Sequence, residues 1–516
     1  MLNEHRGIPL ALILGVALYT AILTCLTWVQ YENLGDPAFD MGVNMQMSAT
    51  ILQTGLPLET ANWAITNGRL STNFFGIHFS PVKYLLAGAY WFYPSGITLL
   101  LLQALFVALG SFPTYKLCAN VTKNQRLSLL LSVLYLLFPP TIMANLYDVH
   151  EEAIIPFALL SGYYFYTSKQ YSKAALFFLF TGLIQESANA LLFFTAVQLI
   201  VVNRQDLRAL ITSRRWNTGV TLAIGVLIAS VAAFLLENQL FLAINPSVGF
   251  IPTATTAYGI SPLNLPNLLL QKLGYWLVLL GLAGFLPFAS KKTSIMAIPW
   301  FTVSVFGNNP NFSSLYWQYN FLIVPAWFVG IIYGLNNLSP SKRIWAGFAR
   351  MLKIAPTQRS MLTVLLVVFL VFCPLYPSLA PYLQPGPHIV QSYFPPSNNA
   401  QLAQLYDLIP NGAPVLASDF LFAHVAKSIN VYPIILVHNS TSQRNYLATT
   451  LPNGFTPEYV IILPTDYNAT VQLVPSFPQN YSLLRFAQPV SLYEENSVVS
   501  RDSCPAFSDG CLFETP

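Results

Sequence analysis

Four titratable side chains stand within five residues in the segment "DVHEE": Asp148, His150, Glu151 and Glu152. This density is unusual because only 9% of the 516 residues are charged, whereas soluble domains carry about 25%. A helix start would explain one or two acids through the helix dipole, but not all of these groups. We expect the segment to hold a phosphate group, either directly or through a divalent cation such as Mg²⁺ or Mn²⁺.

A second group of acids lies in "YENLGDPAFDMG", residues 31–42, which contains Glu32, Asp36 and Asp40. Glu32 has the position of a solvated residue at a helix end, and Asp36 precedes a proline, as turn formers do. Asp40 could cap the amphipathic segment that follows it. A carboxylate placed here could also act as a general base that deprotonates an acceptor hydroxyl. We take Asp40 and Asp36 as the candidate catalytic acids.

Further polar residues lie in segments that the topology below places on the same side of a membrane. The segment "GIHFSPVKY" contains His78 and Lys83, which could supply positive charge to a lipid phosphate, although Lys83 could also extend along the membrane surface. Glu186 lies between two apolar runs in "LIQESAN", where it could be a paired turn residue or contact a substrate. The segment "SSLYWQYN" supplies three more candidates for substrate contact or for an aromatic belt: Tyr316, Gln318 and Tyr319.

These residues must be positioned by membrane helices. Hydrophobic residues make up 54% of the chain, and runs such as 8–30 and 360–380 exceed the roughly 20 apolar residues that cross a bilayer. We predict an α-helical polytopic membrane protein with about eleven spans, near 8–29, 96–119, 127–144, 153–168, 173–186, 188–203, 217–236, 267–289, 293–306, 321–335 and 360–377.

The placement of charge predicts an orientation. If the N-terminus is cytoplasmic and each span crosses once, the inner side holds all of the 24 basic residues except Arg69, Lys83, Lys272, Lys427, Arg444, Arg485 and Arg501. Of the 20 acids, only Glu4 and Asp206 then lie inside. Cationic loops resist translocation, so the basic residues favour this orientation. The acids count little in that rule, and their gathering outside favours a site on the outer face.

Two outer regions are large. The first outer loop, 30–95, contains "SPVKYLLAGAYWFYP" (80–94), which is short for a crossing and is typical of a helix lying in the membrane plane. After the transmembrane domain, residues 1–377, we predict a proline-rich linker at 378–397 and an extracytoplasmic α/β domain at 398–516. Its strands are expected in "APVLAS" and "EYVIIL" and its helices in "NAQLAQLYDLIP" and "DFLFAHVAKS". Cys504 and Cys511 are a candidate disulfide on this outer side.

Four motifs carry a resemblance to a known family. "NLGDPAFDMGVNMQ", "GIHFSPVKYLLAGAYWFYPSG", "LYDVHEEAIIPFALL" and "GLIQESANALLF" follow one another in the order and spacing of the membrane-protein family called domain of unknown function 2079. That family, mainly archaeal and bacterial, resembles the C-type (GT-C) glycosyltransferases. In those enzymes, a first outer loop and a second outer loop each carry a catalytic acid, and the donor is a polyprenyl-phosphate sugar.

The resemblance implies roles for particular residues. Asp40 corresponds to the first-loop acid, and Asp148 or Glu151 to the second-loop acid. The chain lacks the adjacent Asp–Glu pair of the best-known transferases, so the choice between Asp40 and Asp36 as base stays open, as does the need for a metal.

The leading hypothesis is therefore a GT-C-like membrane glycosyltransferase that moves a sugar from a polyprenyl phosphate to a lipid, glycan or protein acceptor. The partners expected are membrane lipid and the donor, without nucleic acid. A transporter or flippase of a lipid-linked substrate is one alternative, which charges deep inside spans would favour. A non-catalytic scaffold that displays the outer domain is another. The sequence contains no phosphate-binding glycine-rich loop and no HExxH or GxSxG motif, so a cytosolic nucleotide site is not indicated.

Overall fold

The computed structural model describes residues 7–35, 38–214, 216–246, 259–289, 295–337, 366–367, 397–439 and 444–496. The chain divides into two compact units, each built from separated segments. Unit 1 contains residues 1–36, 47–58 and 70–395, and unit 2 contains residues 37–46, 59–69 and 396–516. The helix α2 (Val43–Thr54) has residues in both units.

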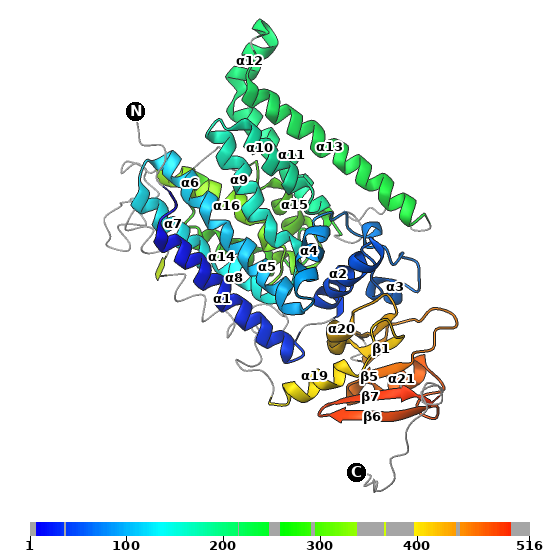
Figure 1. The fold of residues 1–516 in the computed structure, drawn as a ribbon. Helices are drawn as coiled ribbons and strands as arrows, with labels where there is room; N and C mark the ends of the chain where they lie inside the picture. Colours follow the sequence, from blue (N-terminus) through cyan, green and yellow to red (C-terminus); the bar gives the residue numbers. More distant parts are fainter. Residues whose placement is uncertain are drawn as a thin grey trace. The chain divides into compact units, whose positions relative to one another are not determined.

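Unit 1 is helical (Figure 1). Its long helices are α1 (Leu10–Glu32), α4 (Lys83–Phe92), α5 (Gly96–Leu109), α6 (Ser111–Thr122), α7 (Gln125–Leu136), α8 (Pro139–Tyr147), α9 (Ile155–Thr167), α10 (Tyr171–Gly182), α11 (Glu186–Val202), α12 (Arg204–Ser213), α13 (Thr218–Ile244), α14 (Leu269–Leu282), α15 (Ile298–Phe306) and α16 (Asn320–Asn336). Short helical turns lie between them: η2 (Phe74–Gly76), η3 (Glu151–Ile154), η5 (Pro262–Asn264), η6 (Leu286–Ala289) and η7 (Pro310–Ser313).

Apolar length makes several of these helices membrane spans. Among the described residues, four helices are long and apolar enough to cross a bilayer: Leu10–Glu32, Gly96–Thr122, Gln125–Tyr147 and Thr218–Ile244. The pair Glu186–Val202 and Arg204–Ser213, bent by 74°, makes a fifth if it is one span. These helices coincide with predicted spans, while the total of about eleven and the last span, 360–377, stay predictions; that span lies almost wholly outside the described residues.

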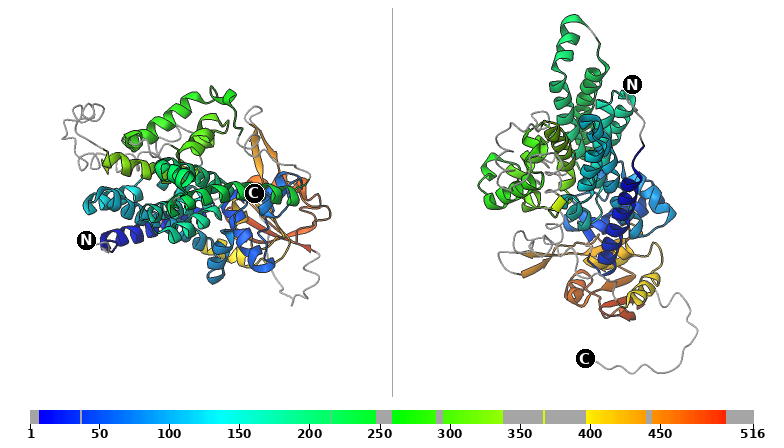
Figure 2. Two further views of the ribbon diagram at one scale, coloured as in Figure 1. Left: turned by 90° about the horizontal axis from the view of Figure 1, so that it is seen from above. Right: turned by 90° about the vertical axis from the view of Figure 1, so that its left-hand side faces the viewer.

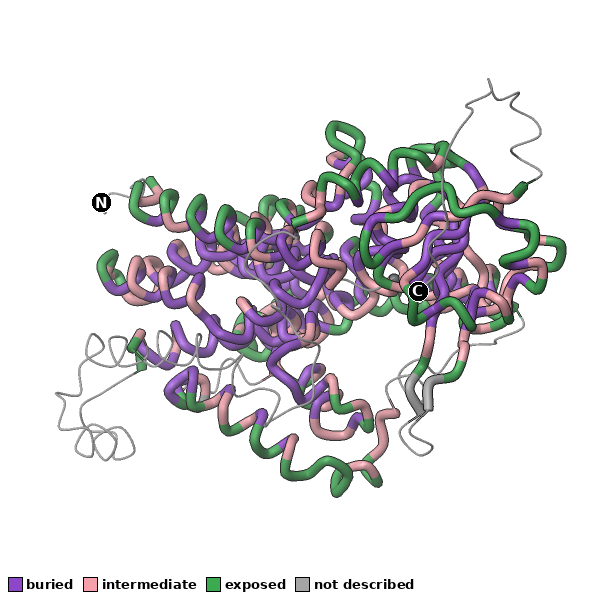
Figure 3. Tube along the Cα trace, turned by 90° about the horizontal axis from the view of Figure 1, so that it is seen from below, coloured by how far each residue is buried: buried purple, intermediate pink, exposed green. Residues whose placement is uncertain are grey.

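Helices of unit 1 pack side by side, some consecutive in the chain and others separated by further helices. The pairs α1 and α5, α6 and α7, α9 and α10, and α11 and α13 are in contact. In both turned views of Figure 2 the cyan and green helices stay bundled. Buried stretches gather where helices meet, and exposed ones lie along outer sides (Figure 3). Exposed leucines and isoleucines on α1 and α13, such as Leu14 (60%) and Leu236 (70%), are what a hydrocarbon environment would cover.

Unit 2 contains a five-stranded sheet in the order β2-β1-β5-β7-β6. Strands β1 (Val415–Ser418) and β5 (Tyr459–Ile462) are buried throughout, and β1 runs parallel to both β2 (Val431–Ile434) and β5. Strand β7 (Val490–Glu495) pairs antiparallel with β5 and with β6 (Tyr481–Ala487). A separate hairpin joins β3 (Leu436–Asn439) to β4 (Arg444–Leu447). The helices of this part are α19 (Asn399–Asp407), α20 (Asp419–Val425) and α21 (Tyr467–Leu473), with the short turn η8 (Pro464–Asp466).

The two predicted strands and the two predicted helices of this region are confirmed. The fold class is confirmed as well: a mostly helical membrane protein with a small α/β region near its C-terminus. The predicted linker, 378–397, lies outside the described residues except Ser397, and the candidate disulfide residues Cys504 and Cys511 lie outside them too.

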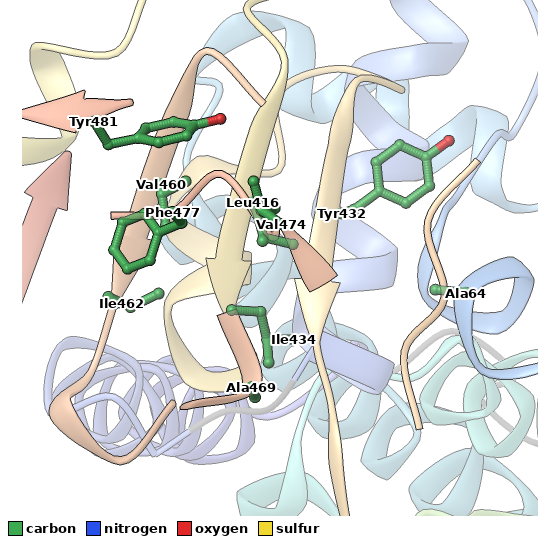
Figure 4. Close-up of a cluster of buried hydrophobic side chains, with 10 residues drawn as sticks. All are labelled: Ala64, Leu416, Tyr432, Ile434, Val460, Ile462, Ala469, Val474, Phe477 and Tyr481. Carbon is green, nitrogen blue, oxygen red and sulfur yellow. The ribbon is translucent and has the colours of Figure 1, made fainter. Parts of the chain in front are cut away.

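Two pieces of the predicted first outer loop, residues 37–46 and 59–69, belong to unit 2. They form the π-helical turn η1 (Ala38–Gly42) and the short helix α3 (Ala61–Ile65). The side chain of Gln46 donates to the carbonyl oxygens of Ser428 (2.7 Å) and Val431 (3.1 Å), and the Thr60 hydroxyl donates to Val431 (2.5 Å). Ala64 lies with Tyr432 and other sheet residues in one hydrophobic cluster (Figure 4). The sheet edge at β2 is therefore covered by residues that lie 371 to 385 positions earlier in the chain.

Candidate functional site

The loop that carries His78 and Lys83 is fastened to the turn between α10 and α11. The Ser80 hydroxyl donates to the carbonyl oxygen of Ile184 at 2.6 Å, and the Val82 amide donates to that of Leu183 at 3.0 Å. Ser80 is fully buried. These bonds set the loop beside the first residue of α11, Glu186.

His78 forms an ion pair with Glu186. Its Nδ1 lies 2.5 Å from Oε1 of Glu186, while the Phe79 amide donates to Oε2 at 3.1 Å. Burial by itself would lower the pKa of His78, but the carboxylates of Glu186, Glu151 and Glu152 outweigh it and raise the pKa to about 9. The imidazole therefore carries a positive charge at neutral pH. Both side chains keep some exposure, 31% for His78 and 23% for Glu186.

Lys83 and Glu151 form a second ion pair that is almost wholly buried. The Lys83 Nζ lies 2.5 Å from Oε2 of Glu151, and the two side chains are 3% and 4% exposed. The ammonium group also lies 5.4 Å from the centre of the Phe74 ring, which in turn contacts His78. Burial tends to raise the pKa of Glu151, but the Lys83 charge outweighs it and the pKa is lowered.

Glu152 adds a third carboxyl to this cluster and is 5% exposed. Burial raises its pKa to about 7, with a further contribution from the Glu151 charge. Its Oε2, like Oε1 of Glu151, is buried without a hydrogen-bond partner in the part of the chain that the structure describes. The structure thus brings together five predicted site residues: His78, Lys83, Glu151, Glu152 and Glu186.

Gln103 of α5 holds the neighbouring segment in place. Its Nε2 donates to the carbonyl oxygens of Asp148 (2.6 Å) and Asn145 (3.1 Å), and its Oε1 accepts from the His150 amide (2.6 Å). The Asp148 carboxylate accepts from the Val149 amide at 2.6 Å and is 1% exposed. Asp148 and His150 therefore lie at fixed backbone positions just before η3.

The aromatic segment near 316–319 reaches the same region through Trp317. The rings of Trp317 and Tyr147 are 4.4 Å apart, and Tyr147 stacks on His150 at 5.4 Å. Among the predicted contacts, Gln318 is 8% exposed and its Oε1 has no partner within the described residues. Tyr316 is buried, and Tyr319 packs against Trp300 and Phe312.

The candidate base lies in the other unit. Asp40 is half-buried in η1, where its carbonyl oxygen accepts from the Asn44 side chain at 2.9 Å. A π-helical turn is rare and frequently lies at a functional site, so the setting of Asp40 agrees with a functional role. Asp36 lies outside the described residues. The meeting of Asp40 with the cluster around Glu151 stays a prediction.

Sequence reasoning missed Gln103 and Glu237. Glu237 lies inside α13, is 3% exposed, and accepts from the Asn189 side chain at 2.7 Å. The predicted span ended at residue 236, which placed this acid just outside it. A lone acid in a 27-residue apolar helix was the signal that could have found it.

The expected divalent cation stays a prediction. Within the described ranges, no group of three or more His, Cys, Asp or Glu side chains is arranged to hold a metal ion. The nearest set of acids is already engaged, since Glu151 pairs with Lys83 and Glu186 with His78.

Comparison with known proteins gives this geometry a context. A family model described as predicted membrane protein (DUF2079) matches residues 30–482. The crystal structure of ArnT from Cupriavidus metallidurans bound to undecaprenyl phosphate is similar over 93% of this chain and 97% of that chain, with a TM-score of 0.52 and 15% identity. At this identity the similarity shows the fold. No curated protein matches in sequence.

Two further solved structures are similar at lower TM-scores. The similarity to the apo state of the same ArnT covers 94% of this chain and 97% of that chain, at a TM-score of 0.49 and 15% identity. The similarity to the arabinosyltransferase EmbB from Mycobacterium smegmatis covers 66% of this chain and 32% of the EmbB chain, at a TM-score of 0.39 and 15% identity.

Proposed function

The chain belongs to the DUF2079 family of predicted membrane proteins, and from that membership and the fold it shares with ArnT we propose that it is a membrane glycosyltransferase. It moves a sugar from a polyprenyl phosphate to a lipid, glycan or protein acceptor. The reaction takes place at the outer membrane face, with the N-terminus in the cytoplasm and unit 2 outside. This proposal goes beyond fold similarity, because one fold hosts many activities.

The observation that carries the proposal is the pair of cations held by carboxylates in unit 1. Lys83 and the protonated His78 are positioned before any ligand arrives, each beside an acid. Preorganised positive charge in a water-poor site stabilises charge that develops during a reaction. His78 is the more accessible of the two, and Lys83 supplies buried charge behind it. A lipid phosphate is the anion that such a site on a membrane protein suits.

The reaction assigned to these residues is a displacement of the lipid phosphate by an acceptor hydroxyl. The acceptor hydroxyl oxygen attacks the anomeric carbon of the donor, and the bond between that carbon and the phosphate oxygen breaks. The electron pair stays on the phosphate, which leaves as polyprenyl phosphate while Lys83 and His78 stabilise its charge. The hydroxyl proton passes to a carboxylate, which we assign to Asp40, with Asp36 as the other candidate.

The proposal is tested with the full chain in lipid nanodiscs and sugar-loaded undecaprenyl phosphates. Asp40→Asn should lower the transfer rate by about 10² to 10⁴ fold, because the amide cannot accept the proton. Asp407→Asn is the matched control, since Asp407 is exposed at the end of α19. Full transfer by the Asp40→Asn chain would rule out this base.

A second arm tests the cations. The double variant Lys83→Met with Glu151→Gln removes the ion pair without leaving a buried charge unpaired. It should bind undecaprenyl phosphate more weakly than the wild type. Lys272→Met is the control, because Lys272 is equally buried and donates to the carbonyl oxygen of Asn264 at 2.8 Å. Unchanged lipid binding in the double variant would overturn the assignment of Lys83.

Glu237 favours one alternative, a transporter of a lipid-linked substrate. A buried carboxyl within a helix long enough to span is the kind of group that transport pathways contain. In a liposome assay, movement of labelled lipid across the bilayer that stops in Glu237→Gln, with no sugar transfer, would favour that alternative.

A further inference from the structure

Uncharged polar groups without partners gather beside the charged cluster. The Nε1 of Trp317, the Oε1 of Gln318 and both side-chain polar atoms of Asn145 are buried without a hydrogen-bond partner in the described part of the chain. Asn145 is 1% exposed and Gln318 is 8% exposed. A buried polar group that nothing satisfies destabilises the folded protein. Native proteins keep few of them, and a run of several calls for an explanation.

These groups belong to one place in unit 1. The Trp317 ring contacts Tyr147 at 4.4 Å, and Tyr147 lies two residues after Asn145 at the end of α8. Tyr147 in turn stacks on His150, with ring planes 22° apart. A continuous path of aromatic rings therefore leads from Trp317 to the residue before Glu151.

The segment that carries Trp317 and Gln318 is rigidly held. Asn320 donates from its side chain to the carbonyl oxygens of Ser314 and Trp317, both at 2.9 Å. Its Oδ1 accepts from the Tyr275 hydroxyl at 3.0 Å, and that hydroxyl accepts from Trp300 at 2.8 Å. All three anchoring side chains are buried. The unpartnered groups thus lie on a preorganised turn, as binding groups do.

We infer that Asn145, Trp317 and Gln318, with the Tyr147 ring, form the subsite for the sugar of the donor. This inference rests on the proposed function. A sugar presents C–H faces that pack on aromatic rings, and hydroxyls that both donate and accept. The indole N–H and the Asn145 amide offer donors, while the amide oxygens of Asn145 and Gln318 accept. The three polar side chains are uncharged, which favours a neutral ligand over phosphate or metal.

The test compares two ligands on the same protein. The full chain in nanodiscs is titrated with undecaprenyl phosphate and with its glucosyl, mannosyl and arabinosyl esters. In the wild type, at least one ester should bind more tightly than the bare lipid. Trp317→Phe keeps an aromatic ring at the position but removes the N–H. This variant and Gln318→Met should each weaken the binding of that ester about 3- to 10-fold. Binding of the bare lipid should not change.

A stability measurement separates a ligand site from an internal structural contact. Replacing an unpartnered buried amide by an apolar side chain of similar size removes a destabilising group. Asn145→Leu should therefore keep or raise the unfolding midpoint of the ligand-free protein, and it should weaken the binding of the ester. Trp276→Phe is the matched control, since it removes another indole N–H that is buried without a hydrogen-bond partner among the described residues, on a ring that contacts Phe301 and Trp327. It should leave ester binding unchanged.

Two results would overturn the subsite. One is that no ester binds more tightly than the bare lipid. The other is that the variants weaken the binding of the bare lipid and of the ester by the same factor. Either result leaves the proposed function standing if transfer or bare-lipid binding still depends on Asp40 and Lys83. Absence of all lipid binding in the wild type, by contrast, defeats the proposed function and the subsite together.

Discussion

At the scale of single residues, the ion pairs show which part of the site was predictable. The sequence marks "DVHEE" as dense in charge, and His78, Lys83 and Glu186 as polar residues in an apolar chain. It does not say that Lys83 pairs with Glu151 and His78 with Glu186, because those partners lie 68 and 108 positions apart. Only tertiary packing decides such pairs. Gln103 was missed for the same reason, since a glutamine in an apolar helix has no local signature.

Glu152 gives a pH prediction. Its pKa is raised from 4.5 to about 7 by burial and by the Glu151 charge, so the folded chain holds this proton more tightly than the unfolded chain. The stability gained from that proton is complete below about pH 4.5 and is lost as the pH rises through about 7. Glu152→Gln imitates the protonated acid. At pH 8 its free energy of unfolding should exceed that of the wild type by up to about 3 kcal/mol.

The measurement is the unfolding midpoint of wild type and Glu152→Gln in nanodiscs between pH 5 and 8. The difference in unfolding midpoint between Glu152→Gln and the wild type should widen as the pH rises. The difference between the exposed control Asp407→Asn and the wild type should not. His78, His150 and Glu151 also act on the Glu152 carboxyl and are present in both chains. A constant gap across this range would show that Glu152 does not titrate there.

At the scale of elements, the turn η1 is the least expected feature. Sequence patterns predicted β1, β5, α19 and α20 because their apolar periodicity is local. They could not predict that η1 would pack on α20, since no local pattern encodes a contact across roughly 380 residues. Gly42 makes the contact possible: a Cβ there would lie 3.0 Å from Cε1 of the Phe422 ring and closer still to Cδ1.

Gly42→Ala should therefore destabilise unit 2 by about 1–3 kcal/mol, the usual cost of overpacking. It should also lower transfer, because the shift displaces the turn that carries Asp40. Gly88→Ala is the control: it lies in α4 with nothing within 4 Å of the added carbon. Normal stability and transfer in Gly42→Ala would mean that Phe422 moves aside freely.

At the scale of the whole molecule, composition predicted a polytopic membrane protein, and the described helices confirm it. What composition could not give is the division into units. A hydropathy plot follows the chain in order, so it assigns the first outer loop to the transmembrane domain. The structure instead assigns 37–46 and 59–69 to the unit that contains the C-terminal sheet.

That division predicts the effect of removing the tail. A chain ending at residue 397 lacks β1, β2 and β5, and with them the Val431 and Ser428 carbonyls that accept from Gln46. Gln46 and Thr60 are fully buried, so the truncated chain would expose both, along with Ala64. We expect limited proteolysis to cut between residues 37 and 69 in the truncated chain and to spare that stretch in the full one. Sugar transfer should be lost, while cutting within α5 to α11 stays unchanged, because those helices pack within unit 1. A first loop that resists protease equally in both chains would show that it folds without the sheet, and the tail would then be dispensable for holding Asp40.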